Sequence, residues 1–375
     1  MGSINKKVLV LYASAGHGHE KAARAIAEAV RDQYPGYEVS AKDVIAFMPG
    51  IFSHVYRQTY LLQIKLAPWL WGIFYYFFDV PWIYAFVKLL RRLMNAANSS
   101  KLTNLLMEEK PDVIITTHFF ATEVSSYLRG RGKIKSKIIT VVTDYLPHYV
   151  WTAKNSDMYA VALPETKVGL TDRGVRGNRI EVVGIPVEKK FLAPVDSAQV
   201  RKNLGLEEGL FTVLLTSGGV GIASIADIVK DLSVSKTPMQ LLVVCGTNQS
   251  LKLQLEKTYQ ANPAIKLLGF VTNMNELMEI SDIVVGKAGG LTITESFLKG
   301  KPVVLYRSIP GQEARNVDIV LRYGAGYATD NDKEVARIVE RLAKSQEEMR
   351  ALKKAAGQIA RPQAAKAIAD LAARL

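Results

Sequence analysis

Short apolar runs alternate with amphipathic stretches along the chain, which predicts strands alternating with helices. The first run, Lys7–Ala13, is continuously apolar, as in a strand covered on both faces. After Gly16–Gly18, apolar residues recur at helical spacing from Ala22 to Val30, and Pro35-Gly36 ends that helix. Further strands are predicted at Tyr37–Val44, Asp112–Thr117, Lys137–Asp144, Met158–Leu163 and Ile180–Ile185.

The polar stretch 188–208 contains Pro194 and Gly205 and is predicted to be a linker, after which the alternation restarts. The second series of strands is predicted at Phe211–Thr216, Gln240–Gly246, Lys266–Val271, Asp282–Gly286 and Pro302–Tyr306. Two such series predict two doubly wound, Rossmann-like α/β domains, whose ligands bind in a cleft beyond the carboxyl ends of the strands. We expect one domain at 1–187, the other at 209–345, and a helical segment, 346–375, that packs back on the first.

Composition narrows the class of partner. The one cysteine, Cys245, excludes an internal disulfide and suits a reducing, cytosolic compartment. The net charge of +13 indicates an anionic partner, either nucleic acid, anionic lipid or a phosphorylated substrate. The first half is the more basic half and holds all four tryptophans, which favours a membrane surface over nucleic acid.

A glycine-rich turn follows the first predicted strand and carries two histidines. Glycine lets the backbone approach a ligand, and the N-terminus of the following helix favours negative charge. A histidine at this place, His19 rather than His17, is a candidate general base because its ordinary pKa lies near neutrality. The alternative is that either histidine only caps the helix.

Two later glycine turns are candidates for holding a nucleotide. The turn at 217–221 lacks the lysine of a Walker A motif and the spacing of a dinucleotide fingerprint, which disfavours an ATPase or a nicotinamide enzyme. In the segment 282–295, Gly289-Gly290 opens a helix whose first turns carry Thr292 and Glu295, a pattern that suits a diphosphate and a ribose diol. Downstream polar side chains suit sugar hydroxyls: Gln312, Glu313 and Asn316. Simple helix capping is the alternative for Thr292 and Glu295.

These motifs together resemble the monogalactosyldiacylglycerol synthases and processive diacylglycerol glucosyltransferases of glycosyltransferase family 28. The matching stretches are AGHGHEKAARAI at 15–26, VTDYLPHYVWTAKNSDMYAVA at 142–162, GKAGGLTITES at 286–296 and PGQEARNV at 310–317, with GFVTNMNELM at 269–278. They run in the family's order through most of the chain. Single motifs are shared with the enzyme that adds N-acetylglucosamine to lipid-linked cell-wall precursors.

The resemblance implies a GT-B fold, a UDP-sugar donor, no bound metal or other cofactor, and inversion at the anomeric carbon. It makes His19 the base and places Gly18, Tyr145, His148 and Trp151 on the acceptor side. On the donor side it assigns the diphosphate to Gly218, Gly219, Gly289, Gly290 and Leu291, the uracil to Phe270 and Val271, the ribose to Glu295, and the hexose to Gln312 and Glu313. His17 stands where the family often has glycine or asparagine, which leaves donor and acceptor preference open.

An aromatic segment at 51–94 suits an acceptor of diacylglycerol type. Its clean apolar part, Leu66–Phe78, is 13 residues long and is shorter than the roughly 20 needed to span a bilayer. Basic residues flank it, so we expect it to lie at the membrane interface through Trp69, Trp71, Phe74 and Trp82. The alternative is a buried helical subdomain. The basic loop Arg129–Lys137 is a second candidate for anionic headgroups, or is simply solvated.

The sequence therefore predicts a monotopic glycosyltransferase on the cytoplasmic face of a membrane, which moves a hexose from a UDP-sugar to a diacylglycerol-type lipid. The motif Asp330-Asn331-Asp332 is expected to cap a helix rather than to bind metal, and no nucleic-acid motif is found. The alternatives are a UDP-N-acetylglucosamine transferase acting on a cell-wall precursor, a UDP-sugar epimerase, and a nonenzymatic membrane-bound UDP-sugar sensor. Neither the donor hexose nor the number of sugars transferred can be read from the sequence.

Overall fold

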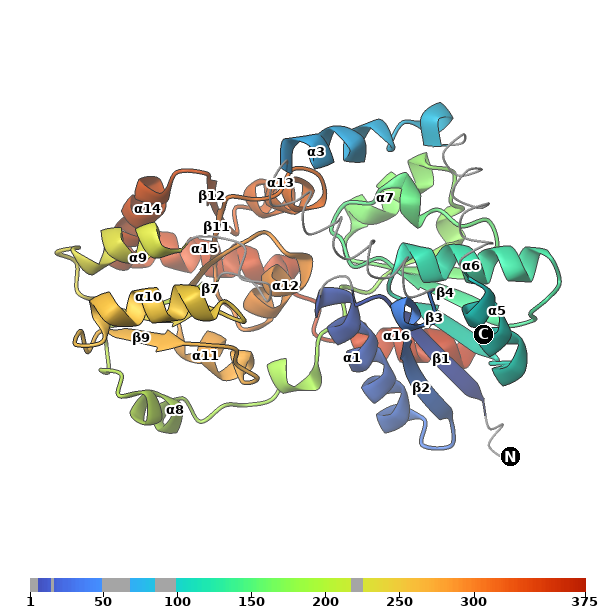
Figure 1. Ribbon diagram of the computed structural model, residues 1–375, viewed down its shortest axis with the longest axis horizontal. Coiled ribbons are helices and arrows are strands. Elements are labelled where there is room, and N and C mark those ends of the chain that lie inside the picture. The colour runs from blue at the N-terminus through green and yellow to red at the C-terminus, as the bar shows by residue number, and fades with distance from the viewer. Residues whose placement is uncertain (1–5, 15–16, 49–67, 85–98, 217–224) are drawn as a thin grey trace. The chain divides into compact units, whose positions relative to one another are not determined.

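The computed structural model describes residues 6–14, 17–48, 68–84, 99–216 and 225–375, which belong to two units (Figure 1). Unit 1 consists of Met1–Glu188, Pro310–Gln312 and Arg361–Leu375, and unit 2 consists of Lys189–Ile309 and Glu313–Ala360. The first boundary therefore falls between Glu188 and Lys189.

Unit 1 contains a parallel six-stranded sheet in the order β2-β1-β3-β4-β5-β6. Its strands are β1 (Lys7–Tyr12), β2 (Glu38–Asp43), β3 (Val113–Thr116), β4 (Lys137–Val141), β5 (Met158–Val161) and β6 (Ile180–Val182). Besides short 3-10 helices, its described helices include α1 (His17–Gln33), α3 (Pro68–Phe77), α5 (Ser100–Glu109), α6 (Phe119–Gly130), α7 (Pro164–Asp172) and α16 (Ala364–Arg374).

Strand β1 shows why its sequence is an unbroken apolar run. Val8 and Val10 point into a core that also contains residues of α1 and α16. Leu9 and Leu11 point into the opposite core, which contains residues of α5 and α6. Because successive side chains alternate between two covered faces, every position in the strand must be apolar.

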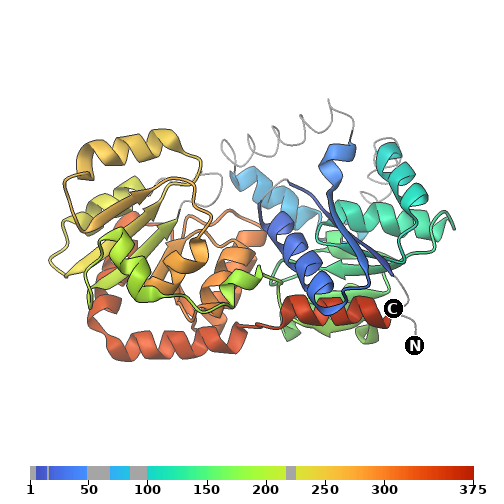
Figure 2. The same cartoon turned by 90° about the horizontal axis from the view of Figure 1, so that it is seen from below.

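The last helix of the chain completes unit 1. Helix α16 lies beside α1, as Figures 1 and 2 show, and buries Ile368 and Leu371 in the same core as Val8. Polar contacts reinforce this packing, because the Tyr34 hydroxyl donates to Asp370 over 2.8 Å and the Lys6 ammonium donates to the Ala373 carbonyl over 2.8 Å. The chain end is thus part of the fold of unit 1.

Unit 2 repeats this architecture with the strand order β12-β11-β10-β7-β8-β9, again parallel. Its strands are β7 (Phe211–Thr216), β8 (Met239–Val244), β9 (Ile265–Leu268), β10 (Ile283–Gly286), β11 (Val303–Tyr306) and β12 (Gly326–Thr329). Its helices within the described residues are α8 (Ser197–Leu204), α9 (Ala226–Ser233), α10 (Gln249–Tyr259), α11 (Met274–Ile280), α12 (Gly290–Leu298), α13 (Gln312–Tyr323), α14 (Asp332–Lys344) and α15 (Gln346–Ile359).

Strand order reverses once in each sheet, and each reversal marks a switch point. In unit 1 the chain goes from β1 to β2 on one side and then to β3 on the other, so the switch lies between β1 and β3. In unit 2 the corresponding switch lies between β7 and β10. Crevices at the carboxyl ends of strands at such switches are the usual ligand sites of doubly wound sheets.

All the strands predicted from the sequence form, with bounds that differ by a few residues, and the α/β fold class is confirmed. Strand β12 matches a short strand expected just before Asp330-Asn331-Asp332, for which no bounds were predicted. The stretch 188–208, predicted as a linker, contains α8, which begins after its Asp196 cap and ends at Gly205 in the left-handed conformation (φ 58°). Helix α8 buries none of its side chains, so its sequence lacks the apolar periodicity that predicts a helix.

Candidate active site

The first turn of α1 places His19 at the switch point of the first sheet. The Nδ1 atom of His19 lies 2.7 Å from the carbonyl oxygen of Thr117, the residue that follows β3. The Thr117 hydroxyl in turn donates to the His19 carbonyl over 2.9 Å. These two bonds join the start of α1 to the end of β3. Beside His19, a side chain on Gly18 in the first turn of α1 would meet no atom of the described residues within 4 Å.

The bond to Thr117 fixes which ring nitrogen of His19 carries the proton. A carbonyl oxygen only accepts, so Nδ1 must donate its hydrogen to Thr117. The Thr143 hydroxyl lies 3.1 Å from the same Nδ1 atom. The lone pair of neutral His19 is therefore on Nε2, the atom that accepts a proton when the residue acts as a base.

The surroundings of His19 also keep it neutral at pH 7. Burial lowers its pKa from 6.5, while the negative charge of Asp144 and the hydrogen bond to Thr117 raise the pKa in part. Neutral imidazole is the form that a general base requires. After proton uptake, the Asp144 carboxylate is the group that stabilises the positive ring.

The three acceptor-side residues predicted in the loop 143–151 are buried within that loop. The Trp151 indole is 1% exposed, and its Nε1 donates to the Asp144 carboxylate over 3.1 Å. The Tyr145 carbonyl accepts from the Thr166 hydroxyl over 2.6 Å, and His148 caps the short helix Tyr149–Trp151 by accepting from the Val150 amide. Their packing favours a role in shaping the loop beside His19 over direct side-chain contact with an acceptor.

On unit 2, the β10–α12 turn presents backbone amides at the switch point of the second sheet. Gly289 is the N-cap of α12, and the Ile293 amide makes the first bond within the helix, to the Gly289 carbonyl over 3.0 Å. Because glycine has no capping side chain, it leaves the amides of Gly290, Leu291 and Thr292 without a side-chain cap from this position. This end of the helix dipole suits an anion such as a diphosphate.

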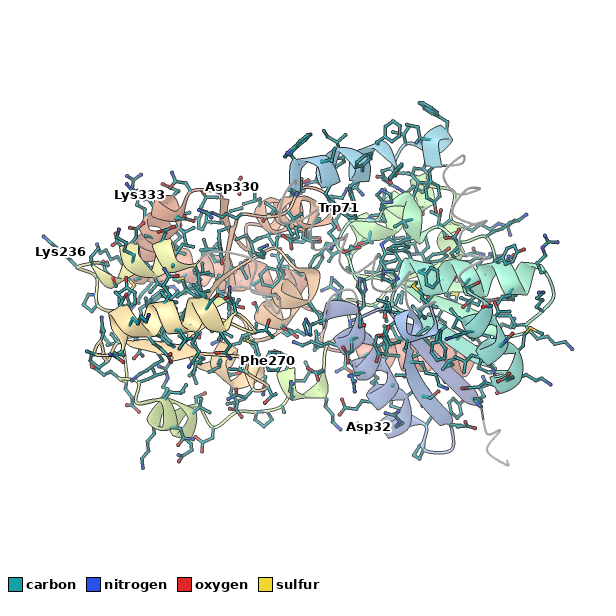
Figure 3. The ribbon with its side chains drawn as sticks, viewed as in Figure 1. Asp32, Trp71, Lys236, Phe270, Asp330 and Lys333 are labelled. Atoms are coloured by element: carbon teal, nitrogen blue, oxygen red, sulfur yellow. The ribbon has the colours of Figure 1, made fainter. Side chains whose placement is uncertain are left out.

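The other predicted donor-binding residues differ in how far their side chains are exposed. Phe270, beyond the end of β9, is 59% exposed and is labelled in Figure 3, and Val271 beside it is partly buried. Glu295 is buried along α12, so its contact with a ribose remains a prediction. Gly218 and Gly219 lie outside the described residues.

Helix α13 contributes the residues predicted to contact the hexose. It begins at Gln312, and the Glu313 carboxylate accepts from the Ile309 amide over 2.8 Å. The Asn316 side chain is buried, and its Nδ2 donates to the Ala288 carbonyl over 2.9 Å. Asn316 thereby ties α13 to the β10–α12 turn, a bracing role that its amide performs before any ligand binds.

Lys287 is a donor-side residue that the sequence analysis did not single out. It directly follows β10, and burial lowers the pKa of its ammonium while the Glu313 carboxylate raises it. Burial conversely raises the pKa of Glu313, while the Ile309 amide and Lys287 lower it. A partly desolvated cation thus stands three residues before Gly290, the first residue of α12, close in sequence to amides that suit an anion. In the sequence, the position of Lys287 within the GKAGG motif is the feature that could have indicated this role.

The predicted membrane residues lie on α3 and on the helical residues 81–84 that follow it. Trp69 is 63% exposed, Trp82 is 75% exposed and Phe74 is also exposed, whereas Trp71, labelled in Figure 3, is partly buried. Helix α3 has ten residues, and within the described ranges there is no helix long and apolar enough to cross a membrane. The exposed aromatic face therefore lies along the surface of unit 1.

The basic loop Arg129–Lys137 lies at the opposite edge of the unit 1 sheet from the loop 143–151. It leads into β4, whereas the loop 143–151 follows β4, so the two loops lie at opposite ends of the strand. Arg131, Lys133 and Lys135 are exposed there, while Arg129 forms an ion pair with Asp157. The loop is thus remote from His19 along the strand direction.

Two further groups carry structural rather than chemical roles. Asn331, in the Asp-Asn-Asp motif, caps α14 by accepting from the Lys333 amide, which confirms the capping prediction. The described part of the chain holds no cluster of three or more potential metal ligands. Cys245 is buried directly after β8, and burial raises the pKa of its thiol to about 11, which makes it a poor nucleophile.

Comparison with known proteins then decides the family. The monogalactosyldiacylglycerol (MGDG) synthase profile matches residues 19–187, and the glycosyltransferase family 28 C-terminal domain matches residues 212–375. Processive diacylglycerol beta-glucosyltransferases of Staphylococcus aureus strains MRSA252 and Newman are 30% identical over 347 residues, 92% of this chain and 86% of theirs. The chain belongs to the diacylglycerol glycosyltransferases of glycosyltransferase family 28. The resemblance predicted from the motifs is confirmed.

More distant solved structures show the GT-B fold that this family implies. HepE from Anabaena in complex with UDP has 16% identity and a TM-score of 0.59, with 99% of this chain and 100% of that chain covered. MurG from Acinetobacter baumannii has 15% identity and a TM-score of 0.63 at the same coverage. A UDP-N-acetylglucosamine 2-epimerase has 12% identity and a TM-score of 0.60 over 96% and 93% of the two chains. The fold is thus shared by different activities, and the sequence relationship distinguishes the family.

Several site residues of this family 28 enzyme required the structure to be found. Thr117 and Asp144 are the last residues of two predicted strands, so their place at the sheet edge could be read from the sequence, but their contacts with the His19 region could not. His118 is buried with its ring 4.9 Å from the His19 ring in an edge-to-face arrangement. Contacts between residues about a hundred positions apart have no local signature.

Proposed function

We propose that this enzyme transfers a hexose from a UDP-sugar to the free hydroxyl of a diacylglycerol-type lipid, with inversion at the anomeric carbon. The observation that carries the proposal is the state of His19, which is held neutral with its lone pair on Nε2 at the switch point of unit 1. The relationship to diacylglycerol glucosyltransferases across 92% of the chain supports the class of substrate.

In the proposed reaction, the acceptor hydroxyl gives its proton to Nε2 of His19 as its oxygen attacks the anomeric carbon. The bond from that carbon to the diphosphate oxygen breaks, and its electron pair leaves with UDP. A single displacement from the face opposite the leaving group inverts the configuration. Asp144 stabilises the imidazolium on unit 1, and the amides at the start of α12 stabilise the diphosphate on unit 2.

We propose that Lys287, together with these amides, takes the place of a metal ion in neutralising the leaving group. Replacing Lys287 by methionine keeps the aliphatic stem and removes the charge. A hydrogen bond to a charged group contributes about 1.5–3 kcal/mol, so the KM for the UDP-sugar should rise about tenfold or more. Steady-state kinetics with varied UDP-sugar measures this. Addition of EDTA should leave the transfer rates of the wild type and of Lys287→Met unchanged. A metal requirement in either protein would contradict the assignment.

A product assay tests the function itself. The protein is incubated with diacylglycerol and with UDP-glucose or UDP-galactose in turn, and the lipid products are identified by mass and linkage. A β-linked monohexosyl product supports the proposal, and further sugars on that product would show processive transfer. Absence of any glycolipid with both donors would contradict it.

Two alternatives are less well supported. A transferase acting on a lipid-linked cell-wall precursor shares single motifs and the fold, but the match to MurG is 15% identical, against 30% for the diacylglycerol enzymes. A nonenzymatic UDP-sugar sensor would have no use for a neutral base beside Asp144. UDP-N-acetylglucosamine with a cell-wall precursor serves as the comparison substrate in the same assay.

We further propose that the enzyme acts as a peripheral protein on the cytoplasmic face of a membrane, where α3 lies in the interface. The exposed aromatic side chains on α3 are of the kind that bind membrane interfaces, and a reducing compartment suits the buried thiol of Cys245.

Replacing Trp69 and Trp82 together by serine should lower partitioning to lipid vesicles about tenfold or more, because burying each large apolar side chain contributes about 1.5–3 kcal/mol. Cosedimentation with vesicles measures this partitioning. The matched control replaces two exposed apolar residues of unit 2, Val234 and Leu253, by serine, and should bind as the wild type does. Equal loss in both double variants would contradict a specific role for α3.

A further inference from the structure

The Asp79 carboxylate joins the aromatic segment 68–84 to two other segments of unit 1. Its side chain is 7% exposed, and its Oδ1 atom accepts a hydrogen bond from the Tyr149 amide over 2.8 Å. Its Oδ2 atom accepts from Nη2 of Arg173 over 2.6 Å. Arg173 directly follows α7, so Asp79 connects the end of α3 with the loop 143–151 and with α7. A buried, paired carboxylate of this kind holds its neighbours in one arrangement.

Two more contacts bind the same segment to the same part of the loop. The Nδ1 atom of His148 accepts from the Val150 amide over 3.0 Å, so its Nε2 carries the hydrogen and donates to the Tyr75 carbonyl over 2.9 Å. The Tyr84 and Tyr149 rings pack with their centroids 5.5 Å apart. Segment 68–84 therefore contacts residues 148–150 through hydrogen bonds to backbone groups, through the Asp79 carboxylate and through packing of tyrosine rings.

The loop 143–151 continues from these contacts to the base. Trp151 follows residues 148–150 and donates its indole N–H to Asp144. Asp144 acts electrostatically on His19, and the Thr143 hydroxyl lies 3.1 Å from the Nδ1 atom of His19. Residues 148–150 are thus connected through Trp151 and Asp144 to His19, so a segment held against them is held at a fixed place relative to the base.

Helix α3 presents its other face outward. Ile73, Tyr76 and Phe77 are exposed together with Trp69 and Trp82. One side of the segment accordingly exposes apolar side chains, while the opposite side contacts the loop of the base.

We propose that Asp79 is a positioning residue that fixes the lipid-facing helix α3 relative to the loop of the base, so that an acceptor in a lipid surface is presented to His19. This inference rests on the proposed function. It assigns Asp79 no contact with substrate. Asp79 matters when the acceptor resides in a membrane and matters little when the acceptor arrives from water.

The chain offers a matched control for Asp79. Asp157 accepts from a backbone amide, that of Ile138 over 2.8 Å, and from the guanidinium of Arg129, as Asp79 does from Tyr149 and Arg173. Asp157 lies at the opposite edge of the sheet, before β5. Substitution of either aspartate by asparagine removes one buried charge from the same kind of pair, so both variants carry a similar cost in stability.

The test compares Asp79→Asn with Asp157→Asn on two acceptors, a long-chain diacylglycerol in phosphatidylcholine vesicles and a short-chain diacylglycerol dissolved below its micelle concentration. For Asp79→Asn we expect kcat/KM to fall about tenfold or more on the vesicle acceptor and less than about threefold on the dissolved one. Vesicle binding should stay near that of the wild type. Asp157→Asn should affect both acceptors alike. Equal losses on both acceptors in Asp79→Asn, no loss, or lost vesicle binding would overturn the proposal.

Hydrogen exchange provides a second measurement that needs no activity. Asp79→Asn should speed exchange of the amides in 143–151 about tenfold, and Asp157→Asn should leave them unchanged. Arg173→Gln, which removes the other partner of the pair, should reproduce the Asp79 result if Asp79→Asn fails to fold. Unchanged exchange in 143–151 would overturn the positioning role even in a protein that transfers no hexose, whereas an inactive wild type with faster exchange in the variant would contradict only the proposed function.

Discussion

Replacing His19 by alanine is expected to lower kcat for hexosyl transfer by about 10²- to 10⁴-fold, the range that a positioned general base contributes. The alanine side chain has no group to take the acceptor proton, so that proton must pass to water as the oxygen attacks. The loss should appear in kcat rather than in the KM for UDP-sugar, because the amides of α12 and Lys287 remain in place.

Initial rates and calorimetric binding of UDP measure the two effects separately. His17→Ala is the control, because His17 is an exposed histidine two residues before His19. This variant should change kcat by less than about threefold. The pH dependence provides an independent check. Because the pKa of His19 is lowered from 6.5, the acid limb of kcat/KM should fall below pH 6.5 with unit slope and be absent from His19→Ala. Unchanged turnover in His19→Ala would remove it as the base.

Removing residues 361–375 is expected to prevent unit 1 from folding stably. The deletion takes away α16 and leaves the apolar side chains of α1 and β1 facing water on that side. Full burial of Ile368 and of Leu371 stabilises by about 1.5–3 kcal/mol each, before the smaller alanines are counted. The free energy of burial lost with α16 is comparable with the whole stability of a domain, about 5–15 kcal/mol.

Thermal unfolding and limited proteolysis of the purified protein measure this effect. The single variant Ile368→Ala should lower the free energy of unfolding by about 2–5 kcal/mol. Lys366→Ala, on the exposed side of the same helix, should change it by less than about 0.5 kcal/mol. A truncated chain that unfolds at the temperature of the intact protein would show that α16 is dispensable.

The fold could be predicted from the sequence where burial leaves a local pattern. Strand β1 is apolar at every position because both of its faces are covered, and that pattern is visible without any partner. Strand β12 and helix α8 have no such pattern. Three of the four residues of β12 are only partly buried at the sheet edge, and α8 buries no side chain, so its capping residues were interpreted as parts of a linker.

The candidate site followed the same rule. His19 and the glycines of α12 could be located because strand, glycine turn and helix are consecutive in the sequence. The family resemblance placed Trp151 on the acceptor side, but its indole is buried against Asp144. The bonds from His19 to Thr117 and Thr143 join residues that only the sheet brings together.

The buried thiol of Cys245 has a practical consequence for studying this enzyme. The chain contains one cysteine, and that cysteine is buried, with a pKa of about 11, so maleimide reagents leave it untouched at neutral pH. A cysteine introduced at an exposed position such as Ile73 can therefore be labelled selectively in the otherwise native protein. A polarity-sensitive dye at that position would report the arrival of α3 at a lipid surface during turnover.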